Sequence, residues 1–225
     1  MKRPIITILS ALIAALFLSG GTIRPVSAAE PMSQSAKRYG ANAVPGQIEA
    51  KVGAPSPNFT LDAVVSSVRG NEFKRVSLTD FRGKWVVFFF YPGDFTFVCP
   101  TEIKGFSDAL TEFTKLNTAV LGASVDSKYS HLAWIQRGDL GSLKYPLLSD
   151  ITKEVAERYG ILDEVEGVAM RGLFIIDPDG ILQYKVVHNH AVGRNVDEVL
   201  RVLAALQTGD LCPLGWKPGE KTLGK

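Results

Sequence analysis

The stretch "KWVVFFFYPGDFTFVCPTEI", residues 84–103, decides the fold and contains one of only two cysteines in the chain. Its first eight residues form a continuous apolar run rich in β-branched and aromatic side chains, which predicts a central strand covered on both faces. After Pro100, apolar residues recur every three or four positions, which predicts an amphipathic helix. These apolar positions are Ile103, Phe106, Leu110, Phe113 and Leu116. Cys99 therefore stands between the end of a strand and the start of a helix.

Strands and helices alternate along the rest of the chain. Apolar runs and period-two alternation predict strands, whereas a period of three to four predicts helices. The expected strands cover 58–65 and 73–78 as an early hairpin, 117–126, and the two arms of a hairpin over 172–187. The expected helices cover 129–137, 152–160 and 195–207, the last with Asn195 as its N-cap. This order predicts a mixed α/β sheet with helices on both faces.

The N-terminal residues differ in character from the rest. Basic residues at positions 2 and 3 precede an apolar run over 5–18 and a small-residue site at 26–29, the order found in a secretory signal peptide. The alternative, an uncleaved anchor, is less favoured because the run is shorter than the roughly 20 residues that a spanning helix needs. We expect a signal peptide over 1–29 and a flexible linker over 30–50. The cleaved protein would lack a stable membrane span and would reside in a bacterial periplasm.

Charge and cysteine content limit the function classes. Cleavage would remove Lys2, Arg3 and Arg24 and no acid, which changes the formal net charge from +2 to −1. A chain so close to neutral lacks the basic footprint of a nucleic-acid-binding protein. An oxidising compartment lets disulfides persist, so the two cysteines could also form one structural bridge.

The position of Cys99 suits a nucleophile. Sites in open α/β sheets gather at the carboxyl ends of strands, and the free N–H groups of a helix start favour a thiolate there. Pro100 fits the first helical position, where its missing N–H is no loss. Three nearby residues add to this environment: Pro92 is stiff, Thr96 carries a hydroxyl and Glu102 carries an acid. The alternative is a small buried hydrophobe, because free cysteines are among the most buried residues.

Several motifs in one order resemble a known family. Pro92, Thr96 and Cys99 match the Pro-x-x-x-Thr-x-x-Cys pattern of the typical two-cysteine peroxiredoxins, of the alkyl hydroperoxide reductase C and thioredoxin peroxidase type. The further matching motifs are "RGLFIID" at 171–177, "VGRNVDE" at 192–198 and "CPLGWKPGEK" at 212–221. The resemblance runs from about residue 51 to residue 223. It implies a thioredoxin-like fold with a mixed central sheet over 51–208, followed by a tail over 209–225.

The resemblance also implies roles for particular side chains. Cys99 would be the peroxidatic cysteine, which attacks a hydroperoxide and becomes a sulfenic acid. Thr96 would hydrogen-bond the peroxide and the thiolate, and Pro92 would shield the site from water. Arg171 would support the thiolate and the developing charge on the peroxide oxygens. Two further residues, Glu102 and Arg194, match positions that orient this arginine, with an ordinary surface ion pair as the alternative.

The second cysteine and the partners follow from the same resemblance. Cys212 would be the resolving cysteine, supplied by the other subunit of a head-to-tail homodimer that could close into a decamer of five dimers. A thioredoxin-like dithiol would then reduce the Cys99–Cys212 disulfide by exchange, without any cofactor. The alternative function is holdase chaperone activity of the oligomer.

Two other classes of function fit the sequence less well. A disulfide exchanger is disfavoured because Cys99 is not part of a Cys-x-x-Cys motif. Metal-dependent chemistry is disfavoured because two separated cysteines and three histidines offer no tetrahedral ligand pattern. His131 and Trp134, in "SHLAW", are instead expected to serve packing or assembly near the site.

Overall fold

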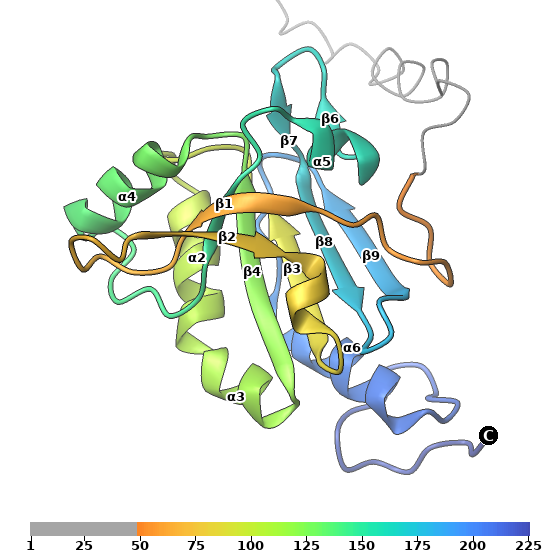
Figure 1. Ribbon diagram of the computed structural model, residues 1–225. Helices are drawn as coiled ribbons and strands as arrows, with labels where there is room; N and C mark the ends of the chain where they lie inside the picture. Colours follow the sequence, from red (N-terminus) through yellow and green to blue (C-terminus); the bar gives the residue numbers. More distant parts are fainter. Residues whose placement is uncertain (1–48) are drawn as a thin grey trace, which may run out of the picture. The chain divides into compact units, whose positions relative to one another are not determined.

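The computed structural model describes residues 49–225, so the expected signal peptide and most of the expected linker lie outside the described residues. Its centre is a seven-stranded sheet with the order β2-β1-β5-β4-β3-β8-β9, beside a two-stranded ribbon of β6 and β7 (Figure 1). The strands are β1 (Thr60–Val64), β2 (Phe73–Ser77), β3 (Trp85–Phe90), β4 (Thr118–Ser124), β5 (Leu147–Ser149), β6 (Leu162–Asp163), β7 (Val168–Ala169), β8 (Arg171–Ile176) and β9 (Leu182–His188). The central strand β3 runs parallel to β4 and antiparallel to β8, which confirms a mixed sheet.

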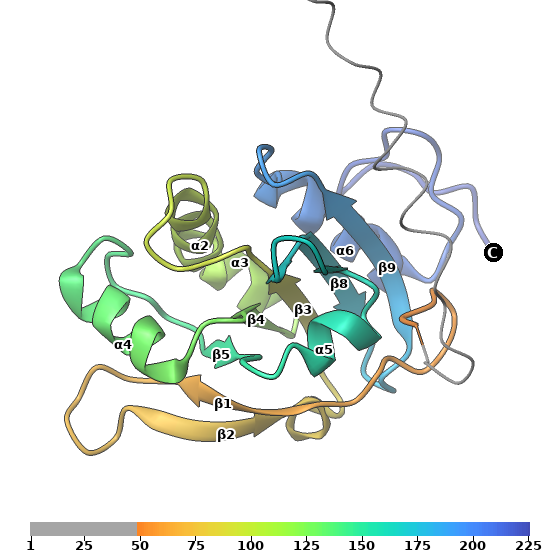
Figure 2. The ribbon, with the colours of Figure 1, turned by 90° about the horizontal axis from the view of Figure 1, so that it is seen from above.

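Helices cover both faces of this sheet, as predicted. They are the 3-10 turn η1 (Leu78–Phe81) and the α-helices α2 (Cys99–Asp108), α3 (Leu110–Lys115), α4 (Lys128–Arg137), α5 (Glu154–Arg158) and α6 (Val196–Thr208). Figure 2 shows α2, α3 and α6 on one side of the sheet and α5 on the other. Asn195 caps α6 through its side chain, which accepts from the N–H of Glu198.

Alternate residues of β3 enter two separate cores. Val86, Phe88 and Phe90 point into the core that contains α5, and at most 1% of each residue is exposed. Val87 and Phe89 point into the core that contains α2 and α6, and both are fully buried. The strand is therefore covered on both faces, and its carboxyl end delivers the loop before Cys99 to the edge of the second core.

Some details differ from the sequence predictions. The helix expected after Pro100 is divided at Ala109, where the N–H of Glu112 donates to the Ala109 carbonyl and tightens the turn. The strands β5, β6 and β7 were not predicted, because two or three residues show no measurable period. Ala50, placed in the expected linker, is buried and donates its N–H to the Arg158 carbonyl, so the packed domain begins before residue 51.

The tail after α6 folds back on itself. Leu211 donates to the Gly224 carbonyl, and Leu223 donates to the Leu211 carbonyl, at 2.8 Å each. Trp216 is buried, and its carbonyl accepts from Nη1 of Arg201 on α6 at 3.0 Å. The first two bonds close the tail on itself, and the bond from Arg201 connects this tail, which contains Cys212, to α6.

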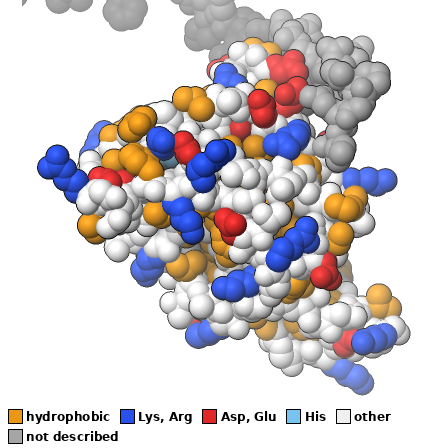
Figure 3. All heavy atoms as spheres, in the orientation of Figure 1, with side chains coloured by type: hydrophobic (Ala, Val, Ile, Leu, Met, Phe, Trp, Pro, Cys, Tyr) orange, Lys and Arg blue, Asp and Glu red, His pale blue; other side chains and the backbone are white. Residues whose placement is uncertain are grey.

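On the face drawn in Figure 3, Lys and Arg side chains lie singly among acidic and apolar side chains rather than in one stripe. Within residues 49–225, no helix is both long enough and apolar enough to cross a membrane.

Gly122 in β4 gives a test of the central packing. A Cβ there would lie 3.0 Å from both Leu147 Cδ2 and Phe89 Cζ. We expect Gly122→Ala to lower the free energy of unfolding by about 1–3 kcal/mol, because the packed side chains of Leu147 and Phe89 would have to shift to admit the methyl group. Urea unfolding of this variant measures the loss. Gly105→Ala is the matched control, since its Cβ would meet only Val196 Cγ2 at 3.5 Å, and an equal loss in both variants would contradict the prediction.

Candidate active site

Cys99 lies at the first residue of α2, where the loop from β3 ends. Its residue is fully buried, and Pro100 follows it at the start of the helix. The helix has no side-chain cap at Val98; the N–H groups of Thr101 and Glu102 donate to the Val98 carbonyl, and Pro100 has no N–H to offer. The predicted position of Cys99 at a helix start is confirmed.

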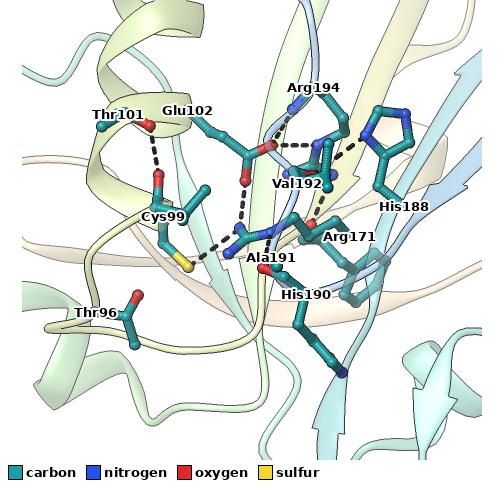
Figure 4. A network of polar contacts seen from close by, with 12 residues as sticks. Thr96, Cys99, Thr101, Glu102, Arg171, His188, His190, Ala191, Val192 and Arg194 are labelled. Atoms are coloured by element: carbon teal, nitrogen blue, oxygen red, sulfur yellow. Dashed lines mark hydrogen bonds and ion pairs between the residues drawn. The ribbon is translucent and has the colours of Figure 1, made fainter. Parts of the chain in front are cut away.

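Arg171 holds its guanidinium against the sulfur. Its Nη1 lies 3.4 Å from Cys99 Sγ and 2.5 Å from Glu102 Oε2, as Figure 4 shows. Its Nε donates to the His190 carbonyl at 2.8 Å. Arg171 opens β8, which pairs with β3, so the sheet itself brings this charge beside the cysteine.

Glu102 links the two arginines of the site. Its Oε1 accepts from both the backbone N–H and Nε of Arg194, at 2.8 and 2.7 Å. Nη1 of Arg194 donates to the carbonyls of Phe90 and Gly172, at 2.7 Å each. The side chains of Glu102, Arg171 and Arg194 are at most 4% exposed, so the alternative of a surface ion pair is wrong.

Burial and pairing act in opposite directions on these groups. Burial alone would raise the pKa of Glu102, but the hydrogen bonds and the charge of Arg194 outweigh it, so this pKa lies below its ordinary value. Burial lowers the pKa of Arg194, and the bond to Glu102 opposes that change. The folded protein therefore favours a charged Glu102 carboxylate.

The structure brings Cys99, Glu102, Arg171 and Arg194 into one network, but it leaves Thr96 outside it. The Thr96 hydroxyl donates to the Gly93 carbonyl at 3.0 Å within the loop. Figure 4 shows Thr96 and Arg171 on different sides of the Cys99 sulfur. The bond of Thr96 to a thiolate or a peroxide therefore stays a prediction.

Pro92 and Cys212 occupy the positions expected from the sequence. Pro92 is half-buried two residues after the end of β3, and Cys212 is half-buried in the tail after α6, where its sulfur lies 3.6 Å from Thr208 Oγ1. Both cysteines are free.

Backbone groups are the part of the site that the sequence did not predict. The carbonyls of His190, Phe90 and Gly172 fix the two arginines. A carbonyl is present at every residue, so no residue type could mark these three as partners.

A buried cysteine at a helix start, held against an arginine on a mixed sheet, is typical of an enzyme that uses a reactive thiol. Comparison with known proteins agrees. Residues 52–185 match the AhpC/TSA family. Peroxiredoxin-1 of Gallus gallus is 51% identical over 183 residues, which cover 78% of this chain and 90% of that protein.

Solved structures give the same result. The reduced 2-Cys peroxiredoxin of Plasmodium vivax has a TM-score of 0.71 at 44% identity, over 76% of this chain and 91% of that one. AhpC of Mycobacterium tuberculosis has a TM-score of 0.68 at 41% identity, over 75% and 99%. The chain belongs to the AhpC/TSA family and has its thioredoxin-like fold. It is a peroxiredoxin, an oxidoreductase that reduces peroxide with a thiol.

Glu102→Gln should destabilise the protein in a pH-dependent way. At pH 7 we expect a loss of about 3 kcal/mol, because two buried arginines lose their counter-charge. The folded pKa of Glu102 is lowered, so its contribution is complete above the ordinary value of 4.5 and is lost as pH falls through the lower folded value. The difference between wild type and variant should therefore shrink below pH 4.5.

Urea unfolding of both proteins at a series of pH values measures this difference. Glu198→Gln is the control, because Glu198 pairs with Arg201 while 48% of its side chain is exposed, and it should cost less than about 1 kcal/mol. A Glu102→Gln difference that stays constant with pH would show that the charge of the carboxylate is not what stabilises the fold.

Proposed function

We propose that Cys99 is the peroxidatic cysteine and reduces hydrogen peroxide and organic hydroperoxides. The thiolate attacks the terminal peroxide oxygen; the S–O bond forms as the O–O bond breaks. Cys99 becomes a sulfenic acid, and the leaving oxygen takes up a proton to give water or an alcohol. The observation that carries this proposal is the contact of Arg171 Nη1 with the sulfur in a buried site.

Five neighbours support this step. Arg171 stabilises the negative charge on sulfur and then on the leaving oxygen. Glu102 and Arg194 keep that guanidinium in place through their buried bonds. Thr96 binds the peroxide, and Pro92 limits water at the sulfur.

Cys212 of the partner subunit then resolves the sulfenic acid in a head-to-tail homodimer, which could assemble further into a decamer. The two sulfurs join in a disulfide as one water leaves. Because Cys99 is fully buried, the first turn of α2 must open for this step. A thioredoxin-like dithiol reduces the disulfide by exchange. The order of basic, apolar and small residues over 1–29 is the basis for proposing export, and we place the cycle in a bacterial periplasm.

Substitution of each cysteine separates the two roles. Cys99→Ser should abolish peroxide consumption with a thioredoxin system, because no nucleophile remains. Cys212→Ser should consume one peroxide per subunit and then stop, because the sulfenic acid has no partner. Peroxide assays give the turnover, and non-reducing electrophoresis shows whether the wild type forms a disulfide-linked dimer. Sustained turnover by Cys99→Ser would refute the assignment.

Arg171→Lys tests the planar donor of the site. We expect the second-order rate constant for peroxide to fall by about 10²-fold, since the single nitrogen of an ammonium cannot occupy both the Nη1 position beside sulfur and Glu102 and the Nε position beside the His190 carbonyl. Stopped-flow measurement with the Cys212→Ser protein isolates this step. Arg158→Lys, which alters an arginine bonded to the Asn58 carbonyl, should react at the wild-type rate, and an equal fall in both variants would count against a specific role of Arg171.

A further inference from the structure

The loop between β3 and α2 carries Pro92 and Thr96, yet Thr96 itself does little to fix it. Its hydroxyl bonds only within the loop, to the Gly93 carbonyl. The preceding residue, Phe95, has a φ of 56°, a left-handed conformation that costs a residue with a side chain about 1–2 kcal/mol. Such a conformation persists only where its surroundings hold it. Something outside the loop must therefore fix the backbone just before Thr96.

Asp94 supplies the first fixed point. Its side chain is 1% exposed and accepts from the Tyr91 hydroxyl at 2.9 Å and from Nδ1 of His131 at 2.9 Å. Its backbone N–H donates to Asp126 Oδ2, also at 2.9 Å. Both the side chain and the main chain of Asp94 are thus tied to elements outside the loop.

His131 on α4 is fully buried and faces oxygen on both sides of its ring. Nδ1 meets the Asp94 carboxylate, while Nε2 lies 3.1 Å from the Leu148 carbonyl, which can only accept. Nε2 is therefore the side of the ring that donates to the carbonyl, while Nδ1 pairs with the carboxylate. Loss of either partner would leave a buried polar group unpaired.

Phe95, the next loop residue, also packs on α4. The Phe95 ring lies 5.7 Å from the ring of Trp134 and 5.6 Å from the guanidinium carbon of Arg137. Trp134 follows His131 by three positions and Arg137 follows Trp134 by three, so each pair consists of neighbours on the helix surface. Two consecutive loop residues, directly before Thr96, are thus docked on α4.

We propose that Asp94 and His131 are positioning residues for peroxide reduction, which hold the loop so that the Thr96 hydroxyl faces the peroxide bound at Cys99. The role rests on the proposed function of Cys99 and assigns to α4 a part in the reaction. Neither side chain touches the sulfur, so both act through Thr96.

This arrangement predicts a separation between two reactions of the same sulfur. Thr96 contributes to reaction with peroxide, whereas alkylation by iodoacetamide needs only an accessible thiolate. In the Cys212→Ser background, Asp94→Asn should slow sulfenic acid formation by about tenfold or more. The rate of alkylation of Cys99 should stay the same. A general loss of structure at the site would instead expose the buried sulfur and raise the alkylation rate while the peroxide rate falls.

A double-mutant cycle gives the decisive measurement. If Asp94 acts through Thr96, Asp94→Asn should cost less than about twofold once Thr96 is Val, because the group it positions is gone. His131→Asn, which keeps an N–H donor near Nδ1, should retain most of the rate, while His131→Leu should behave like Asp94→Asn. Independent, additive losses in the cycle would overturn the proposal.

Two controls keep these outcomes distinct. Asp150→Asn alters another fully buried acid, which accepts from the N–H groups of Val155 and Ala156, and it should leave the peroxide rate within about twofold of wild type. If Asp94→Asn does not fold, Phe95→Ala replaces it, because that side chain is 46% exposed; its loss must also vanish when Thr96 is Val. A wild-type protein that does not react with peroxide would refute the proposed function and this role together.

Discussion

The site depends on one carboxylate held between two buried guanidinium groups. Glu102 on α2 bonds Arg171 on β8 and Arg194 in the loop before α6, so a single side chain connects three segments far apart in the sequence. A buried charge is tolerated only when it is paired and hydrogen-bonded. Two positive charges and one negative charge leave one positive charge unmatched, and a thiolate at Cys99 completes the balance. The network that stabilises the fold is therefore also the one that suits a charged sulfur.

Arg194 explains why this network fixes the strands as well as the side chains. Its Nη1 bonds carbonyls of β3 and β8, which are neighbours in the sheet, and its guanidinium lies 5.1 Å from the centre of the Phe89 ring. Close approach of the chain at Gly172 is part of the same arrangement, because a Cβ there would lie 2.9 Å from Ile161 Cδ1. The end of the sheet and the reactive cysteine are thus positioned by the same contacts.

The sequence predicted what depends on residue type and period. Apolar runs located the central strands, and the family motifs brought Cys99, Arg171, Glu102 and Arg194 together correctly. It did not predict β5, β6 or β7, which are too short to show a period, or the division of the helix at Ala109. The His131–Asp94 pair was also missed. His131 was expected to pack near the site, but its partner lies 37 residues away and nothing in the spacing links them.

The site must satisfy two opposite requirements if Cys99 is to pair with a second cysteine. It must stay closed while Arg171 bonds the sulfur, and it must open because the sulfur is fully buried. The first turn of α2 lacks a side-chain cap, and the bonds that opening it must break include those from the N–H and hydroxyl groups of Thr101 to the Val98 carbonyl. Glu102 lies three residues after Cys99 and holds both arginines. An opening that ends before Glu102 releases Cys99 and leaves the buried charges paired. One that includes Glu102 would break its bonds to Arg171 and Arg194, and these three charged groups would become exposed to solvent or remain buried without a partner. The position of Glu102 thus sets the natural limit of the motion that the chemistry requires.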